Sequence, residues 1–106
     1  MKRYEIRWAT LNPVLGSEMA KTRPVVVVSL DALNEVLQTV TVCPLTTQLH
    51  PAWRTRIPCR TPGRSAEIAV DQIRTVSKTR IGRKVGKLSD SEALALRRLI
   101  TEMYGE

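Results

Sequence analysis

The residue types that most often catalyse hydrolysis are scarce in this chain. His50 is the single histidine, so an acid–base mechanism that needs two histidines in one subunit is excluded. Cys43 and Cys59 lie far apart and the carboxylates are scattered, so the spacing of a zinc site is absent. Folding could still bring some carboxylates together, but no metal is expected. No glycine-rich phosphate-binding loop occurs, and no cofactor is expected either.

Chemistry based on hydroxyl groups and fixed positive charge remains open to this sequence. RNA is suited to it, because the 2′-hydroxyl is a nucleophile already placed beside the scissile phosphate. The protein then has to align that attack and stabilise the charge that develops on the phosphoryl oxygens. A guanidinium is planar, always charged and bidentate toward phosphate, and a nearby hydroxyl can donate a further hydrogen bond. DNA has no 2′-hydroxyl, so this mechanism would spare it.

The charge of the chain predicts a polyanionic partner. The formal net charge is +7 and the pI is about 10.1, which is typical of a domain that binds nucleic acid. Residues 32–53 contain no lysine or arginine. The basic residues gather instead in the following stretch, as Arg54, Arg56, Arg60, Arg64, Arg74, Lys78, Arg80, Arg83, Lys84 and Lys87. This uneven distribution favours a binding face.

The elements that must position such groups are short strands and one clear helix. Alternating or β-branched runs predict strands over 2–9, 25–29, 39–43, 53–57, 66–70 and 72–76. Asp31 could cap a short helix over 32–37, and Pro44 is expected to end the strand before it. Ser89 and Glu92 form a capping box for a helix over 89–104, and Gly105 suits its C-terminal cap. A stripe of apolar residues on that helix is interpreted as core: Leu96, Leu99, Ile100 and Met103.

These elements predict one mainly β domain over residues 1–106, a small curved antiparallel sheet or barrel with peripheral α-helices. With no phenylalanine, its core should be aliphatic. The N-terminus lacks the apolar stretch of a signal peptide, and no run is long enough to cross a membrane. We therefore expect a cytoplasmic protein, with Cys43 packed as a reduced thiol and His50 in a loop.

Three segments together resemble the MazF/PemK (Kid) family of toxins. The first runs from Asn12 to Glu18 and continues as Thr22-Arg23-Pro24-Val25-Val26-Val27-Val28-Ser29. The second is Val42-Cys43-Pro44-Leu45-Thr46-Thr47, and the third extends from Asp71 to Arg80. Each motif alone is a weak indication, but the three occur in the right order and spacing over nearly the whole chain.

The resemblance implies a fold, an activity and partners. The fold would be an SH3-like small β-barrel of the MazF/Kid/CcdB type with a C-terminal helix, working as a homodimer. The activity would be metal-independent cleavage of single-stranded RNA at short sequences, leaving a cyclic phosphate and a 5′-hydroxyl. A small cognate antitoxin protein would inhibit it by occupying the RNA groove.

The resemblance also assigns roles to individual residues. The catalytic arginine of the family falls on Arg23, which would stabilise charge at the scissile phosphate and donate a proton, since a guanidinium stays protonated and is a poor base. The catalytic threonine falls on Thr46, which would hydrogen-bond the phosphate. Seven further residues match positions expected to contact RNA, namely Ser17, Glu18, Thr47, Asp71, Gln72, Lys78 and Arg80.

The sequence departs from the family pattern in two places. Tyr4-Glu5 stands where a Gly-Asp pair commonly opens the first strand, a change expected to affect only the start of that strand. Met19-Ala20-Lys21 follows Glu18 where glycines are common, so the loop beside the RNA should be stiffer.

Two other functions fit the same residues less well. A CcdB-like toxin would poison a protein such as DNA gyrase without catalysis, through aromatic residues near its C-terminus, where only Tyr104 lies. A basic RNA-binding module with lost activity would bind RNA without cutting it.

Overall fold

A computed structural model describes residues 1–12, 16, 21–61 and 63–105 of the chain. Its strands are β1 (Glu5–Thr10), β2 (Thr22–Val27), β3 (Thr39–Thr46), β4 (Arg56–Thr61), β5 (Arg64–Ala69), β6 (Arg74–Ser77) and β7 (Ile81–Lys87). Its helices are α1 (Asp31–Val36) and α2 (Asp90–Tyr104), with short 3-10 turns η1 (Val70–Gln72) and η2 (Lys78–Arg80).

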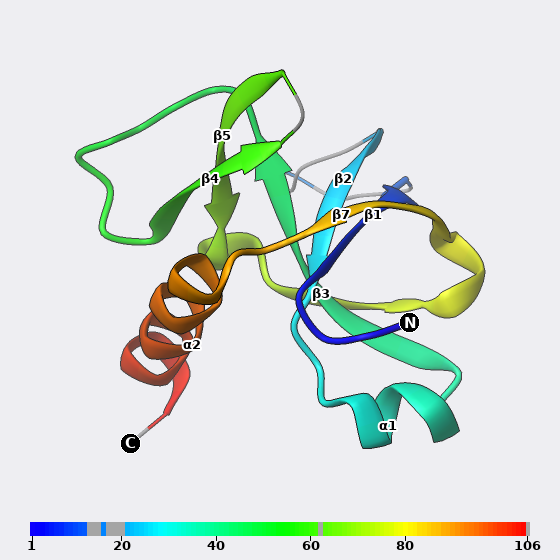
Figure 1. The fold of residues 1–106 in the computed structure, drawn as a ribbon. Coiled ribbons are helices and arrows are strands. Elements are labelled where there is room, and N and C mark those ends of the chain that lie inside the picture. The colour runs from blue at the N-terminus through cyan, green and yellow to red at the C-terminus, as the bar shows by residue number, and fades with distance from the viewer. Residues whose placement is uncertain (13–15, 17–20, 62, 106) are drawn as a thin grey trace.

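Strand β3 organises a strongly curved antiparallel sheet (Figure 1). The strand order is β4-β5-β3-β2-β1-β7, and β6 also pairs with β3. Residues Thr39–Val42 of β3 pair with β6, whereas Leu45 and Thr46 pair with β5. The change of partner lets the sheet fold into a half-barrel, as the SH3-like expectation requires. The fold class predicted from the sequence is confirmed.

Aliphatic side chains fill both sides of the central strands. In β2 and just after it, Val26 and Val28 pack into one cluster beneath α2, while Val25 and Val27 pack into a second cluster with Val40 and Val42 of β3. Each fully buried valine contributes about 1.5–3 kcal/mol to folding, which favours this central position for the valine run. The expectation of an aliphatic core is confirmed, and β2 is buried on both faces.

Helix α2 forms as its local sequence predicts. The Ser89 hydroxyl accepts a hydrogen bond from the Glu92 amide, and the Glu92 carboxylate accepts one from the Ser89 amide, which completes the capping box. Gly105 ends the helix where a Cβ atom would lie 2.8 Å from the Thr101 carbonyl oxygen. The predicted apolar stripe packs on the core. Within the described residues, no helix combines the length and apolar character needed to span a bilayer.

Several predicted boundaries were wrong, mostly at prolines. Strand β3 continues through Pro44 to Thr46, because Pro44 lies where β3 changes partner from β6 to β5. Pro58 lies inside β4, which is tolerated because β4 is an edge strand, so the strand expected over 53–57 instead runs from Arg56 to Thr61 and pairs with β5 as a hairpin. Strand β7 was not predicted, since its basic residues and glycines give no alternating apolar pattern.

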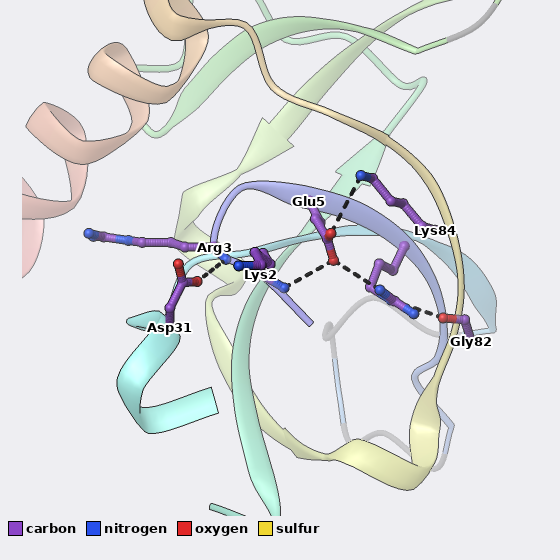
Figure 2. Close-up of polar contacts among 7 residues, drawn as sticks. Lys2, Arg3, Glu5, Asp31, Gly82 and Lys84 are labelled. Atoms are coloured by element: carbon purple, nitrogen blue, oxygen red, sulfur yellow. Dashed lines mark hydrogen bonds and ion pairs between the residues drawn. The ribbon is translucent and has the colours of Figure 1, made fainter. Parts of the chain in front are cut away.

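The N-terminal turn is held by charged side chains, which Figure 2 shows. Asp31 does not cap α1 as predicted; its Oδ1 accepts a hydrogen bond from the Arg3 amide, and Leu30 takes the cap position. Tyr4 has a φ of 71°, a conformation that glycine adopts more easily, so the glycine common in the family has a structural reason at this position.

Glu5 joins the first strand to the last. Its carboxylate accepts a hydrogen bond from the Lys2 amide at 3.0 Å and forms ion pairs with Arg7 at 2.9 Å and Lys84 at 3.5 Å. Burial raises the pKa of Glu5, but the Lys2 amide and the two cations outweigh it, and the pKa lies below its ordinary value.

Candidate functional site

Arg23 and Thr46, the two residues that the resemblance assigns to catalysis, line the same cavity. Its volume is about 580 Å³. Among the described residues, its walls come from four regions: β1 with β7, the start of β2, the end of β3 with the following loop, and the β4–β5 hairpin. The lining residues are Trp8, Thr22, Arg23, Pro24, Leu45, Thr46, Thr47, Gln48, Thr61, Arg64, Ala66 and Val85.

Arg23 reaches the cavity from β2. It is the second residue of that strand and pairs with Ala9 of β1, and the next residue, Pro24, keeps its backbone extended. Its Nη1 donates a hydrogen bond to the Leu45 carbonyl oxygen at 3.5 Å. This contact directs the guanidinium toward the end of β3, beside Thr46.

Thr46 presents an oriented hydroxyl at the end of β3. The residue is 7% exposed, and its Oγ1 accepts a hydrogen bond from the Gln48 amide at 3.1 Å. A hydroxyl that accepts in this way still has its own proton to donate. The bond to Gln48 therefore fixes the oxygen while the proton stays available for an acceptor in the cavity.

The structure adds two residues to this site that sequence reasoning had not selected, Arg64 and Trp8. Arg64 is exposed in the β4–β5 hairpin and brings a second guanidinium to the cavity. Trp8 lies in β1, where it pairs with Pro24. The basic stretch of the sequence pointed to Arg64 only as one cation among many, and Trp8 was predicted only as part of the strand over 2–9.

The other predicted RNA-contacting residues divide into four groups. Thr47 is exposed and lines the cavity. Ser17 and Glu18 lie outside the described residues. Asp71 and Gln72 lie in η1 and do not line the cavity; Asp71 Oδ1 accepts a hydrogen bond from Arg56 Nε at 3.1 Å.

Lys78 and Arg80 lie in η2, near the opposite end of β3. Ser77, the residue before η2, pairs with Thr39 at the start of β3. Thr39 is seven residues from Thr46, which corresponds to about 23 Å along the strand at about 3.3 Å per residue. Lys78 Nζ donates to the Asn34 carbonyl oxygen. Arg80 Nη1 donates to the carbonyl oxygens of Asn12 and Thr10. Neither cation is among the described residues that line the cavity, although Arg80 lies near its β1–β2 edge, since the next residue, Ile81, pairs with Ala9, the partner of Arg23.

The cysteines and the histidine, which could serve other catalytic chemistries, lie in environments typical of structural residues. Burial raises the pKa of the Cys43 and Cys59 thiols to about 12, which disfavours the thiolate that a nucleophile requires. The His50 ring stacks on Trp53 with 3.9 Å between centroids. In the described part of the chain, no group of three His, Cys, Asp or Glu side chains is placed to hold a metal ion.

Comparisons with known proteins agree with this architecture. Residues 2–104 match the family described as PemK-like, MazF-like toxins of type II toxin–antitoxin systems. Endoribonuclease EndoA of Bacillus subtilis is 35% identical over 95 residues, covering 85% of this chain and 82% of the relative.

Solved structures have the same fold. MazF from Deinococcus radiodurans superposes with a TM-score of 0.88 at 19% identity, covering 100% of this chain and 97% of the other. An endoribonuclease in complex with its cognate antitoxin, from a mycobacterial species, gives a TM-score of 0.82 at 19% identity, covering 99% and 95%. The chain therefore belongs to the family of PemK-like, MazF-like toxins of type II toxin–antitoxin systems.

Proposed function

We propose that this chain is a toxin endoribonuclease that cleaves single-stranded RNA without a metal ion and is inhibited by a cognate antitoxin protein. The observation that carries the proposal is the common cavity of Arg23 and Thr46, which come from two separate motifs of the sequence. The endoribonuclease name of a relative that is 35% identical supports the same activity.

In the proposed reaction the substrate supplies its own nucleophile. The 2′-oxygen forms a bond to phosphorus while the bond from phosphorus to the 5′-oxygen breaks, giving a cyclic phosphate and a 5′-hydroxyl. The 2′-hydroxyl releases its proton to the solvent, the 5′-oxygen gains one from Arg23, and Arg23 takes a proton back from the solvent, so the step consumes no water overall. Arg23 stabilises the negative charge on the phosphoryl oxygens and donates the proton, and the Thr46 hydroxyl donates a further hydrogen bond.

The cavity suggests how other residues bind the RNA. Arg64 and Thr47 would contact phosphate oxygens next to the scissile one, and Trp8 offers an aromatic surface for a base. Roles for Ser17, Glu18, Asp71, Gln72, Lys78 and Arg80 toward RNA stay predictions. So do the homodimer, the extent of the domain over residues 1–106 and a cytoplasmic site of action.

The CcdB-like alternative has less support. The family match is to MazF-like and PemK-like toxins, and the motifs of Arg23 and Thr46 are present. The hydroxyl of Tyr104, the aromatic residue near the C-terminus, donates to the Val70 carbonyl oxygen of its own chain at 3.0 Å. That contact attaches the end of α2 to η1.

The direct test incubates purified protein with labelled single-stranded RNA in EDTA. We expect cleavage at discrete sites with wild-type protein and none with Arg23→Ala or Thr46→Ala, both checked for folding by circular dichroism. Sequencing the RNA ends would identify the recognition sequence. No cleavage by the wild type, or undiminished cleavage by both variants, would reject the proposal.

A further inference from the structure

A buried pair of charged side chains lies behind Thr46, and the proposed chemistry does not use it. The pair consists of Arg56 in β4 and Glu67 in β5, and Arg56 also contacts Asp71 of η1, whose side chain is 27% exposed. Glu67 is directly opposite Thr46 in the register of β3 and β5, so the Cβ atoms of the two residues lie about 5 Å apart on one face of the sheet. Glu67 is only 4% exposed, which is unusual for a carboxylate.

Thr46 and Glu67 hold the same short segment of backbone. Thr46 Oγ1 accepts the hydrogen bond from the Gln48 amide, and Glu67 Oε1 accepts one from the His50 amide at 2.9 Å. The two acceptors face each other across neighbouring strands and bind alternate amides of residues 47–50. Side chains from β3 and β5 thus together fix the backbone of residues 47–50, just after Thr46.

Arg56 places a buried positive charge beside Glu67, at ion-pair distance rather than hydrogen-bond distance. Its Nη1 lies 3.7 Å from Glu67 Oε1, its Nε donates to Asp71, and its side chain is 6% exposed. Its guanidinium also lies 4.7 Å from the centre of the Trp53 ring, which stacks on His50. His50, in the segment after Thr46, is therefore held at its backbone amide by the Glu67 carboxylate and at its side chain by the Trp53 ring.

Stability alone does not account for this pair. Taking charges out of water costs free energy that their attraction only partly returns, and apolar side chains of similar size often serve a core as well or better. A buried carboxylate does provide a directional acceptor for one particular amide, which an apolar side chain cannot.

We propose that Glu67 is a positioning residue for Thr46: it fixes the 47–50 segment through the His50 amide, with Arg56 as its buried charge partner. This inference rests on the proposed function, because it assigns to Thr46 the contact with the RNA phosphate. A hydroxyl displaced by about 1 Å from its productive position is expected to lower the rate about 100-fold.

Three variants test the inference. Glu67→Leu removes both the charge and the acceptor, whereas Glu67→Gln removes the charge and keeps an amide oxygen for the His50 N–H. Because Glu67→Leu leaves Arg56 buried without its partner and could unfold, the double variant Arg56→Met/Glu67→Leu replaces the whole pair with apolar side chains. Measurements are kcat and KM for the mapped RNA fragment, the melting temperature, and hydrogen exchange of the His50 amide by NMR.

We expect the double variant to melt near the wild-type temperature, to exchange the His50 amide at least tenfold faster, and to lose about 30- to 100-fold in kcat with KM within about threefold. Glu67→Gln should recover most of the kcat. The exchange measurement needs no RNA cleavage, so it separates a failure of this inference from a failure of the proposed function. Unchanged His50 exchange, or wild-type kcat in the double variant, would overturn it.

Discussion

The two ends of strand β3 carry different kinds of polar groups. At the end near Thr39, the cations of η2 bind carbonyl oxygens of the same chain: Lys78 holds the Asn34 carbonyl oxygen of α1. At the end near Thr46, a hydroxyl and the guanidiniums of Arg23 and Arg64 line a cavity of about 580 Å³. Positive charge is present at both ends, and at the second it lines a ligand-sized cavity together with the Thr46 hydroxyl. A high net charge therefore predicts the class of partner and not the location of the site.

The largest effect should come from removing the hydroxyl at the cavity end. Thr46→Val keeps the β-branched shape but cannot donate to a phosphoryl oxygen or accept from the Gln48 amide, so we expect a loss of at least about 100-fold in kcat. Thr46→Ser, the matched control, should stay within about tenfold of wild type. Single-turnover cleavage rates measure both, and a fully active valine variant would remove Thr46 from the mechanism.

A smaller effect is expected at Arg64, which faces the same cavity. Arg64→Ala should weaken RNA binding about tenfold and reduce the slope of log affinity against log salt by about one, as expected for one lost phosphate contact. The control is Arg83→Ala, an exposed arginine of β7 that does not line the cavity. Binding is measured on RNA with a 2′-deoxy substitution at the cleavage site. If Arg64→Ala and Arg83→Ala lowered the RNA affinity equally, Arg64 would contribute no more to binding than an exposed arginine outside the cavity.

The opposite end of β3 should influence stability more than catalysis. Lys78→Met removes the bond to the Asn34 carbonyl oxygen, and we expect a loss of about 1 kcal/mol in unfolding free energy with kcat within about twofold of wild type, since an RNA contact by Lys78 would affect binding rather than kcat. Lys87→Met, at an exposed lysine of β7, should change neither quantity. Urea denaturation and cleavage assays report the two effects. A folded Lys78→Met protein without activity would contradict the contrast between the two ends.

The smallest effect is expected at Glu5, away from both ends. Since the pKa of Glu5 is lowered in the folded state, its ion pairs stabilise the protein above the unfolded pKa of about 4.5, and this contribution is lost as the pH falls through the folded value. Glu5→Gln should therefore be less stable than wild type at pH 7 by under about 1 kcal/mol, and equally stable near pH 3. Thermal denaturation of both proteins at pH 7 and pH 3 tests this prediction. A stability difference between wild type and Glu5→Gln that grew toward low pH would contradict it.

Local sequence determined those parts of the molecule whose contacts lie close together in the chain. The capping box of Ser89 and Glu92 and the apolar stripe of α2 need only helical spacing, and the valine run of β2 needs only its own hydrophobicity. The order of the three motifs also identified Arg23 and Thr46 as candidate catalytic residues, although no single motif showed that they would meet.

Tertiary structure decided what depends on strand register and burial. The cavity joins Arg23 and Thr46 with Trp8 and Arg64 only because β1, β2 and β3 are neighbours and the β4–β5 hairpin folds over their ends. The pairing of Thr46 with Glu67 follows from one particular register of β3 and β5, which a shift of one residue would destroy by turning each side chain to the other face. No local pattern contains that register, because it depends on the packing of the sheet as a whole.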